Sequence, residues 1–118
     1  MQIHRVWYDS PGSDNGSNAS LNGEGVLIKN TSRVSIAITN FTLRDKAGHV
    51  YKFPRTTVGP GKSLWVRTGK GTNNLSNRYW GLTWYVWNNT GDTATLRDPH
   101  GRWLDACSWG NGPGSRYC

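Results

Sequence analysis

The sequence predicts an all-β chain, folded as one antiparallel sandwich or barrel of about seven to nine short strands. Gly, Asn, Ser and Thr are abundant whereas Leu is sparse, and this composition suits short strands and many turns. Short apolar segments recur between Gly-, Pro- and Asn-rich turns, and no apolar stripe of helical period has a useful length. The 118 residues fit a single domain, residues 1–118, with one modest core.

The first half of the chain supplies three expected strands. Residues 3–8 (IHRVWY) alternate loosely and predict the first strand, and residues 8–24 read as a long polar loop full of chain breakers. Residues 25–30 (GVLIKN) form a short apolar run, which predicts a strand buried on both faces. Residues 33–45 carry two sets of apolar positions at period two, and the shift between the sets predicts a bend at residues 39–40.

The second half supplies two hairpins and one further strand. Residues 41–53 predict a hairpin around the turn KAGH, and residues 63–69 (SLWVRTG) predict a strand. Residues 69–77 form another polar loop. TATLRD (93–98) and RWLDACSW (102–109), joined by PHG, predict the last hairpin.

The two cysteines favour a disulfide bond. Cys107 and Cys118 are separated by ten Gly- and Ser-rich residues that can bend back on themselves. The bond would stabilise the C-terminal tail by roughly 2–3 kcal/mol in the loop-entropy model, and it implies an oxidising compartment. Two cysteines without a nearby pair of histidines do not make a zinc site of the usual kind.

The charge of the chain favours anionic partners. The formal net charge is +7 and the isoelectric point about 9.9, a balance that suits nucleic acid, teichoic acid or anionic lipid. The basic residues are scattered, without a run of Lys or Arg. They therefore leave two interpretations open, a generic solvated surface or a functional basic face.

Arginine and tryptophan interleave along the chain. An exposed Trp beside a cation can stack on a base or a sugar while the cation holds a phosphate. Because neighbouring residues of a strand point to opposite faces, partners two apart can share a face and adjacent ones cannot. The alternative is that the tryptophans point inward and the arginines outward. The pairs are Arg5 with Trp7, Trp65 with Arg67, Arg78 with Trp80, and Arg102 with Trp103.

The usual catalytic patterns are missing from the sequence. The histidines His4, His49 and His100 lie in different segments, and no two carboxylates have a spacing that suggests a glycosidase pair. No serine lies in a nucleophile-elbow pattern. The oxygen-rich residues of the loop at 9–24 could hold Ca²⁺, but their spacing does not fit an EF-hand. We therefore expect no metal and no cofactor.

Much of the chain resembles the lamin tail domain family. The matching stretches occur in family order from Glu24 onward and are GEGVLIKN, NFTLRDKAGHVYKFPR, TVGPGKSLWVRTGKG, YWGL and VWNNTGDTATLRDPHG. The resemblance implies an immunoglobulin-like β-sandwich with no recognised active site, and the bacterial secreted branch is the most similar in character. It also implies a module that contacts partner proteins or chromatin, or that accompanies secreted enzymes such as nucleases.

The chain departs from the family pattern at three positions. Bacterial members usually carry an aromatic residue where this chain has Gly25, whereas Trp103 replaces a smaller residue and Trp65 is large for its strand. Such exchanges could reshape a pocket. They are open to two interpretations, natural divergence or an engineered variant with a cavity for a ligand.

The leading functional hypothesis is a monomeric, secreted, non-catalytic accessory module that binds a partner protein or an anionic polymer through Arg5, Arg67, Arg78 and Arg102. No apolar run is long enough to span a membrane. No signal peptide precedes the first strand, and Met1 is interpreted as a start added to a mature domain.

Two further hypotheses come from other classes. The first is a ligand-binding or catalytic pocket lined by Gly25, Trp65, Trp84 and Trp103, with Asp105 or Glu24 as a base desolvated by tryptophan. The second is single-stranded nucleic-acid binding through the tryptophans and arginines. In the aromatic cluster 79–87, Trp80 and Trp87 are expected to fill the core, which leaves Trp84 for contact with a ligand.

Overall fold

The computed structural model describes residues 1–10, 12 and 14–118 of the chain. Its regular structure is almost entirely β, with one short helix, α1 (Asn18–Asn22). The strands are β1 (Gln2–Trp7), β2 (Gly25–Lys29), β3 (Ile36–Ala37), β4 (Thr42–Arg44), β5 (Val50–Lys52), β6 (Thr57–Val58), β7 (Ser63–Arg67), β8 (Asn77–Tyr79), β9 (Asp92–Arg97), β10 (Trp103–Trp109) and β11 (Ser115–Tyr117).

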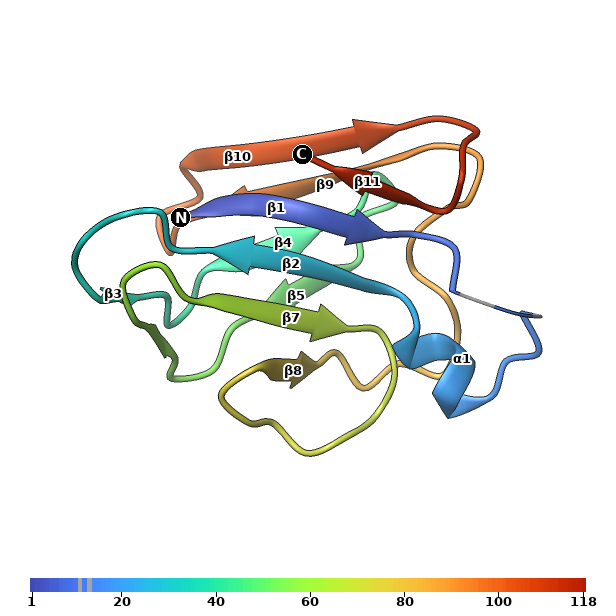
Figure 1. Cartoon of the computed structure of the whole chain (residues 1–118), viewed down its shortest axis with the longest axis horizontal. Coiled ribbons are helices and arrows are strands. Elements are labelled where there is room, and N and C mark those ends of the chain that lie inside the picture. Colours follow the sequence, from blue (N-terminus) through green and yellow to red (C-terminus); the bar gives the residue numbers. More distant parts are fainter. Residues whose placement is uncertain (11, 13) are drawn as a thin grey trace.

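The strands form a sandwich of two main sheets. The five-stranded sheet has the order β11-β1-β2-β7-β8, and the four-stranded sheet has the order β10-β9-β4-β5. In Figure 1 the first sheet lies in front, with β4, β5 and β9 behind it. The strands β3 and β6 form a separate two-stranded ribbon. Among the described strands all pairings are antiparallel except that of β7 with β8, which is parallel. This architecture confirms the all-β sandwich that the sequence predicts.

A row of valines fixes which face of the front sheet is buried. Val6 pairs with Val26, and Val26 pairs with Val66, so the three side chains lie side by side on β1, β2 and β7. All three are buried, at most 1% exposed. Because side chains alternate along a strand, the residues on either side of each valine point away from the core.

Aromatic rings fill much of the space between the sheets. Trp109 stacks on Tyr8 with a centroid separation of 4.9 Å, and it meets Trp87 edge-on at 5.8 Å. Trp80 continues the cluster, 5.9 Å from Trp87. Trp87 is only 2% exposed, and Trp80 is half-buried against the core. Both therefore fill the core, as the sequence predicts, and each contributes a large apolar surface where aliphatic residues are scarce.

Most of the expected strands are present. The hairpins β4–β5 and β9–β10 match the two predicted hairpin segments to within one residue, and β1, β2 and β7 lie where strands are expected. The bend expected at residues 39–40 is present, because Asn40 adopts a left-handed conformation with φ of 67° and separates β3 from β4. The interpretation of residues 25–30 as a strand buried on both faces is wrong, since Leu27 and Lys29 are only half-buried on the outer face.

Four of the described elements were not expected from the sequence, namely α1, β6, β8 and β11. The strand β6 has only two residues, too few to show alternation. The helix α1 lies in the segment read as a loop, where the Ser17 hydroxyl accepts a hydrogen bond from the amide of Ser20. Its five residues are too few to show a helical period. The strands β8 and β11 have three residues each, too few for alternation to be recognised. Residues 11 and 13 of the same predicted loop lie outside the described residues.

The predicted disulfide is confirmed. Cys107 of β10 is bonded to Cys118, with a Cα–Cα distance of 5.7 Å. The backbone amide of Cys118 also donates to the carbonyl of His4 at 2.9 Å. The bond therefore joins the end of the chain, just after β11, to the opposite sheet. Within the described residues, no helix is long and apolar enough to cross a membrane.

Removal of the disulfide should lower stability without changing the fold. The double substitution Cys107→Ala and Cys118→Ala opens a loop closed at a sequence separation of 11. In the loop-entropy model this lowers the free energy of unfolding by about 3 kcal/mol. Urea unfolding followed by tryptophan fluorescence measures the loss, and the wild-type protein under reducing conditions is the matched control. An unchanged midpoint would show that the bond contributes nothing to stability.

Candidate functional site

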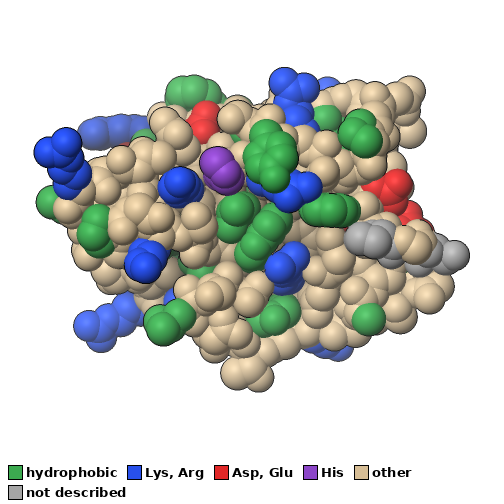
Figure 2. All heavy atoms as spheres, in the orientation of Figure 1, with side chains coloured by type: hydrophobic (Ala, Val, Ile, Leu, Met, Phe, Trp, Pro, Cys, Tyr) green, Lys and Arg blue, Asp and Glu red, His purple; other side chains and the backbone are tan. Residues whose placement is uncertain are grey.

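The outer face of the five-stranded sheet carries arginine and aromatic side chains next to one another. The strand register places Arg5 beside Tyr117 and Leu27, and it places Leu27 beside Trp65. Figure 2, which looks onto this face, shows hydrophobic and basic side chains interleaved across its centre, with acidic ones towards the edges. We call this surface the arginine–tryptophan face, made of Arg5, Trp7, Leu27, Trp65, Arg67 and Tyr117.

Arg5 is held between two aromatic rings. Its guanidinium carbon lies 4.5 Å from the ring centroid of Trp7 and 4.5 Å from that of Tyr117. One terminal nitrogen of Arg5 donates to the hydroxyl of Ser115 at 3.2 Å, and Nε is buried without a hydrogen-bond partner among the described residues. The two rings and Ser115 thus fix the guanidinium in place.

A second stack lies on β7. The guanidinium carbon of Arg67 lies 4.5 Å from the ring centroid of Trp65, and its Nε donates to the side chain of Asn77 at 3.1 Å. Burial lowers the pKa of Arg67, and the nearby Tyr79 raises it in part. The side chain remains a cation at neutral pH, because arginine titrates far above that range. Two of the three pairs whose members are two residues apart, Arg5 with Trp7 and Trp65 with Arg67, therefore share this face and form cation–π contacts.

Gly25 lies under the second stack and not beside a cavity. A Cβ atom on Gly25 would lie 3.1 Å from Cε3 of Trp65, 3.2 Å from the carbonyl oxygen of Val66 and 3.4 Å from Cδ of Arg67. The large side chain of Trp65 therefore occupies the space that Gly25 leaves. The sequence-based expectation of a cavity beside Gly25 is thus wrong, because the small residue and the large one compensate each other on neighbouring strands.

The structure does not gather the other tryptophans of the predicted pocket around Gly25. Trp103 is the first residue of β10, close to Asp105, which accepts a hydrogen bond from the amide of Ile3 near the start of β1. Gly25 instead pairs with Trp7, at the other end of β1. Ile3 and Trp7 are four residues apart on β1, which corresponds to roughly 13 Å along an extended strand. Trp103 is 60% exposed.

Trp84 lies in the loop before β9. It is 63% exposed and packs against Gly16, where an added Cβ would lie only 2.7 Å from Cζ3 of the ring. Its neighbour Tyr85 accepts a hydrogen bond from the amide of Gly16 at 3.1 Å. The ring of Trp84 thus packs on the long N-terminal loop and meets the ring of Tyr85 edge-on at 5.2 Å.

The four arginines predicted to meet an anionic partner also separate. Arg5 and Arg67 share the arginine–tryptophan face. Arg78 pairs with the inward-facing Val66, so it points to the other side of the sheet, and it donates to the carbonyl of Asn74. Arg102 lies exposed in the turn before β10. Only two of the four can therefore act together on one partner surface.

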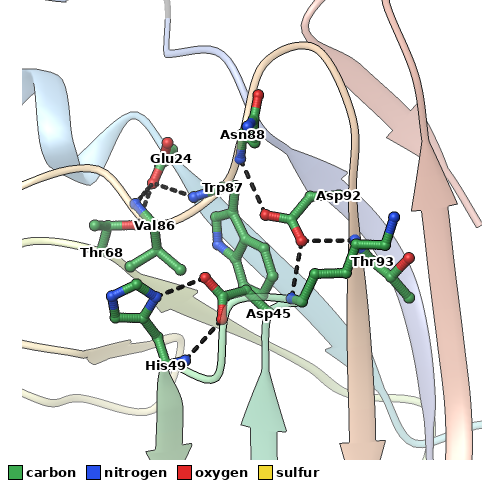
Figure 3. Close-up of polar contacts among 10 residues, drawn as sticks. Glu24, Asp45, His49, Thr68, Val86, Trp87, Asn88, Asp92 and Thr93 are labelled. Atoms are coloured by element: carbon green, nitrogen blue, oxygen red, sulfur yellow. Dashed lines mark hydrogen bonds and ion pairs between the residues drawn. The ribbon is translucent and has the colours of Figure 1, made fainter.

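Glu24, one of the two predicted bases, is a buried structural carboxyl. It is 1% exposed, and its Oε1 accepts hydrogen bonds from the Thr68 hydroxyl at 2.7 Å and from the amides of Val86 at 3.0 Å and Trp87 at 3.4 Å (Figure 3). Burial raises the pKa of Glu24 to about 7, although the Val86 amide, the Thr68 hydroxyl and the Trp87 amide each lower it in part. The side chain of Glu24 thus links the start of β2 by hydrogen bonds to the end of β7 and to the loop before β9.

The other carboxylates near the ends of the sandwich also bind backbone. Asp105, the second predicted base, accepts from the amides of Ile3 and Ala106. Asp92 accepts from the amides of Lys46, Asn88 and Thr93 (Figure 3). Asp45 accepts from the amide of His49 and pairs with its ring at 2.7 Å. These acids stabilise turns and strand ends through hydrogen bonds to amides.

The charges of the sequence are divided unevenly along the chain, a signal that belongs to no single motif. All seven Asp and Glu residues lie outside residues 46–91, whereas seven of the fourteen Lys and Arg residues lie inside this segment. The remaining seven cations balance the seven carboxylates, so the whole net charge of +7 belongs to one stretch of the chain. This stretch includes Trp65 and Arg67, and counting charges by segment would have pointed to it.

Comparison with known proteins identifies a family. The family model described as Lamin Tail Domain matches residues 1–111 of the chain, and the family's immunoglobulin-like fold agrees with the two-sheet sandwich. A search of curated proteins found no match. The matched range ends before β11, so Ser115, Tyr117 and Cys118 lie outside it.

Substitution of Gly25 tests whether it makes room for Trp65. Gly25→Ala should lower the free energy of unfolding by about 1–2 kcal/mol, because the added methyl group meets the ring of Trp65 and the backbone of Val66. Urea unfolding measures the change. Gly110→Ala is the matched control, since nothing lies within 4 Å of a Cβ at that position. Equal effects of the two substitutions would contradict the close packing described here.

The raised pKa of Glu24 makes stability depend on pH. In the folded protein Glu24 keeps its proton up to a pKa of about 7, whereas the pKa of an unperturbed glutamate is about 4.5. The folded state therefore binds more protons between these pH values, and the free energy of unfolding falls as pH rises through this window. The expected loss is about 3 kcal/mol, and it is complete above pH 7.

Glu24→Gln should remove this slope, because glutamine stays neutral and can still accept the same hydrogen bonds. Urea unfolding at several pH values between 4.5 and 8 measures how the free energy of unfolding depends on pH. Asp98→Asn is the control, because amide hydrogen bonds lower the pKa of the exposed Asp98 and it stays ionised throughout the window. A slope that persists in Glu24→Gln would assign the pH dependence to another group.

Proposed function

The chain belongs to the lamin tail domain family, and from this membership we propose that it is a non-catalytic module that binds an anionic polymer across the arginine–tryptophan face. Domains of this family are immunoglobulin-like and generally act as interaction modules. The polymer, the face and the secreted location are our proposals for this chain.

The observation that carries the proposal is the pair of cation–π stacks on one sheet face. Arg5 and Arg67 lie on strands separated by β2 and differ by two residues in register, which separates their Cα atoms by roughly 12 Å. Stacking uses the flat faces of the guanidinium groups, so N–H groups at their edges remain available for an anion. Among the described residues neither arginine forms a salt bridge with a carboxylate.

Single-stranded nucleic acid is the anionic polymer that would use both parts of this face. Its phosphates can pair with guanidinium groups, and its bases can stack on exposed aromatic rings. Trp7 and Trp65 are half-buried, and Tyr117 is 66% exposed, so their rings are accessible in part. A partner protein that binds this face would need an acidic surface for the same reason.

We further propose that the domain acts outside the cell, as a monomer. The disulfide between Cys107 and Cys118 supports an oxidising compartment. The large apolar side chains that are exposed are Val34, Val50, Leu75, Trp84, Trp103, Leu104 and Tyr117. They belong to several strands and loops, and this dispersal favours a monomer over a dimer with one apolar interface.

The alternative of a natural or engineered ligand pocket beside Gly25 and Trp103 has no support in the geometry. Trp65 fills the space over Gly25, and Trp103 lies at the opposite end of β1. The exchanges at Gly25 and Trp65 are explained by mutual packing, so they do not require design.

Binding to a fluorescent single-stranded oligonucleotide tests the proposal. With two phosphate contacts, the logarithm of the affinity should fall with the logarithm of salt concentration with a slope of about −1.4. Arg5→Gln or Arg67→Gln should each reduce this slope by about 0.7 and weaken binding. Trp65→Ala should weaken oligonucleotide binding more than binding of dextran sulfate, which has no bases to stack.

The matched control is the double substitution Arg33→Gln and Arg44→Gln, which removes two exposed cations outside the face. It should change affinity less than Arg5→Gln combined with Arg67→Gln. If the two double variants lose affinity equally, binding follows net charge and the assignment to this face is wrong.

A further inference from the structure

A cleft opens at the β8 edge of the sandwich, away from the arginine–tryptophan face. It lies between β6, the turn that leads into β7, and the residues around the start of β8, and its volume is about 330 Å³. This volume corresponds to that of roughly ten water molecules, and it lies at the low end of small-molecule sites. Val58 and Leu64 are buried and give the cleft an apolar floor.

Two cations line the same cleft. Lys62 is exposed, whereas Arg78 is half-buried and its guanidinium donates to the backbone carbonyl of Asn74. Among the described residues neither cation pairs with a carboxylate. All residues that line the cleft belong to residues 46–91, the segment without Asp or Glu. The cleft therefore has a positive charge that the chain itself does not neutralise.

Leu75 adds an apolar wall at the rim. This side chain is 96% exposed, the most exposed of the large apolar residues among those described, and it lines the cleft. The hydroxyl-bearing residues Ser63 and Ser76 also line the cleft. An apolar floor, an apolar rim and two unpaired cations suit a ligand with one apolar part and one negative charge.

We propose that this cleft binds a small amphipathic carboxylate. The carboxylate lies between Lys62 and Arg78, where the planar guanidinium can bind both of its oxygens, and the apolar body lies against Val58, Leu64 and Leu75. The site is separate from the arginine–tryptophan face, so failure of either proposal leaves the other standing.

A titration with hexanoate, followed by proton–nitrogen NMR spectra at constant ionic strength, tests the site. Backbone amide signals of Gly59, Ser63 and Ser76 should shift and reach saturation. Acetate has the charge without the apolar body, and hexanol has the apolar body without the charge. Each of these should bind at least several-fold more weakly than hexanoate, because each makes only half of the contacts.

Lys62→Gln is the principal variant, because the Lys62 side chain is exposed and the change leaves the fold intact. It should weaken hexanoate binding roughly two- to fivefold, as expected for an exposed charge. Lys52→Gln, an exposed cation on β5, is the matched control and should have no effect. Leu75→Ser should weaken hexanoate binding and leave acetate binding unchanged.

Three results would overturn the proposal. The first is a set of shifts that does not saturate or that spreads over all basic residues. The second is equal binding of hexanol and hexanoate, which would remove the role of the cations. The third is equal affinity of Lys62→Gln and Lys52→Gln for hexanoate, which would show that the anion does not lie beside Lys62.

Discussion

The buried row of Val6, Val26 and Val66 is the constraint on which the outer surface depends. These three side chains face the core in register on neighbouring strands, and alternation then forces their neighbours outward. Arg5 and Trp7 flank the first valine, and Trp65 and Arg67 flank the last. A slip of one residue in any pairing would expose a valine and bury a cation, so burial of three small apolar groups determines where the arginines lie.

Buried hydrogen bonds hold the aromatic core of the sandwich in place. The rings of Tyr8, Trp80, Trp87 and Trp109 fill the interior, and two of them, Trp80 and Trp87, lie in the loop between β8 and β9. Glu24 accepts hydrogen bonds from two amides of this loop and from the hydroxyl of Thr68 within the interior. Burial of a carboxyl group lowers the stability of the fold unless the group forms hydrogen bonds of this kind. The same contacts that satisfy the loop hold the aromatic cluster against β2.

The sequence predicted the two-sheet sandwich better than its shortest strands. Strands with apolar alternation, such as β1, β7 and β9, were recognised from their pattern, and the family resemblance gave the immunoglobulin-like sandwich. The strands β6, β8 and β11 were missed because two or three residues, most of them polar, carry no readable period. The sequence also allowed the two Arg–Trp pairs to share a face, but only the register shows that they meet on one sheet. The compensation between Gly25 and Trp65 could not be predicted, since it joins residues forty positions apart in the chain.

The disulfide bond has a consequence beyond the strength of the fold. Tyr117 precedes Cys118 directly and forms one of the two rings around Arg5, and both residues lie beyond the range that the family model matches. The covalent link to β10 therefore keeps this ring in place, although β11 is a short strand at the edge of the sheet. In a reducing compartment only the hydrogen bonds to β1 would hold β11, so the ring of Tyr117 would be held less firmly over Arg5. The redox state of the surroundings thus decides how rigidly that cation is presented.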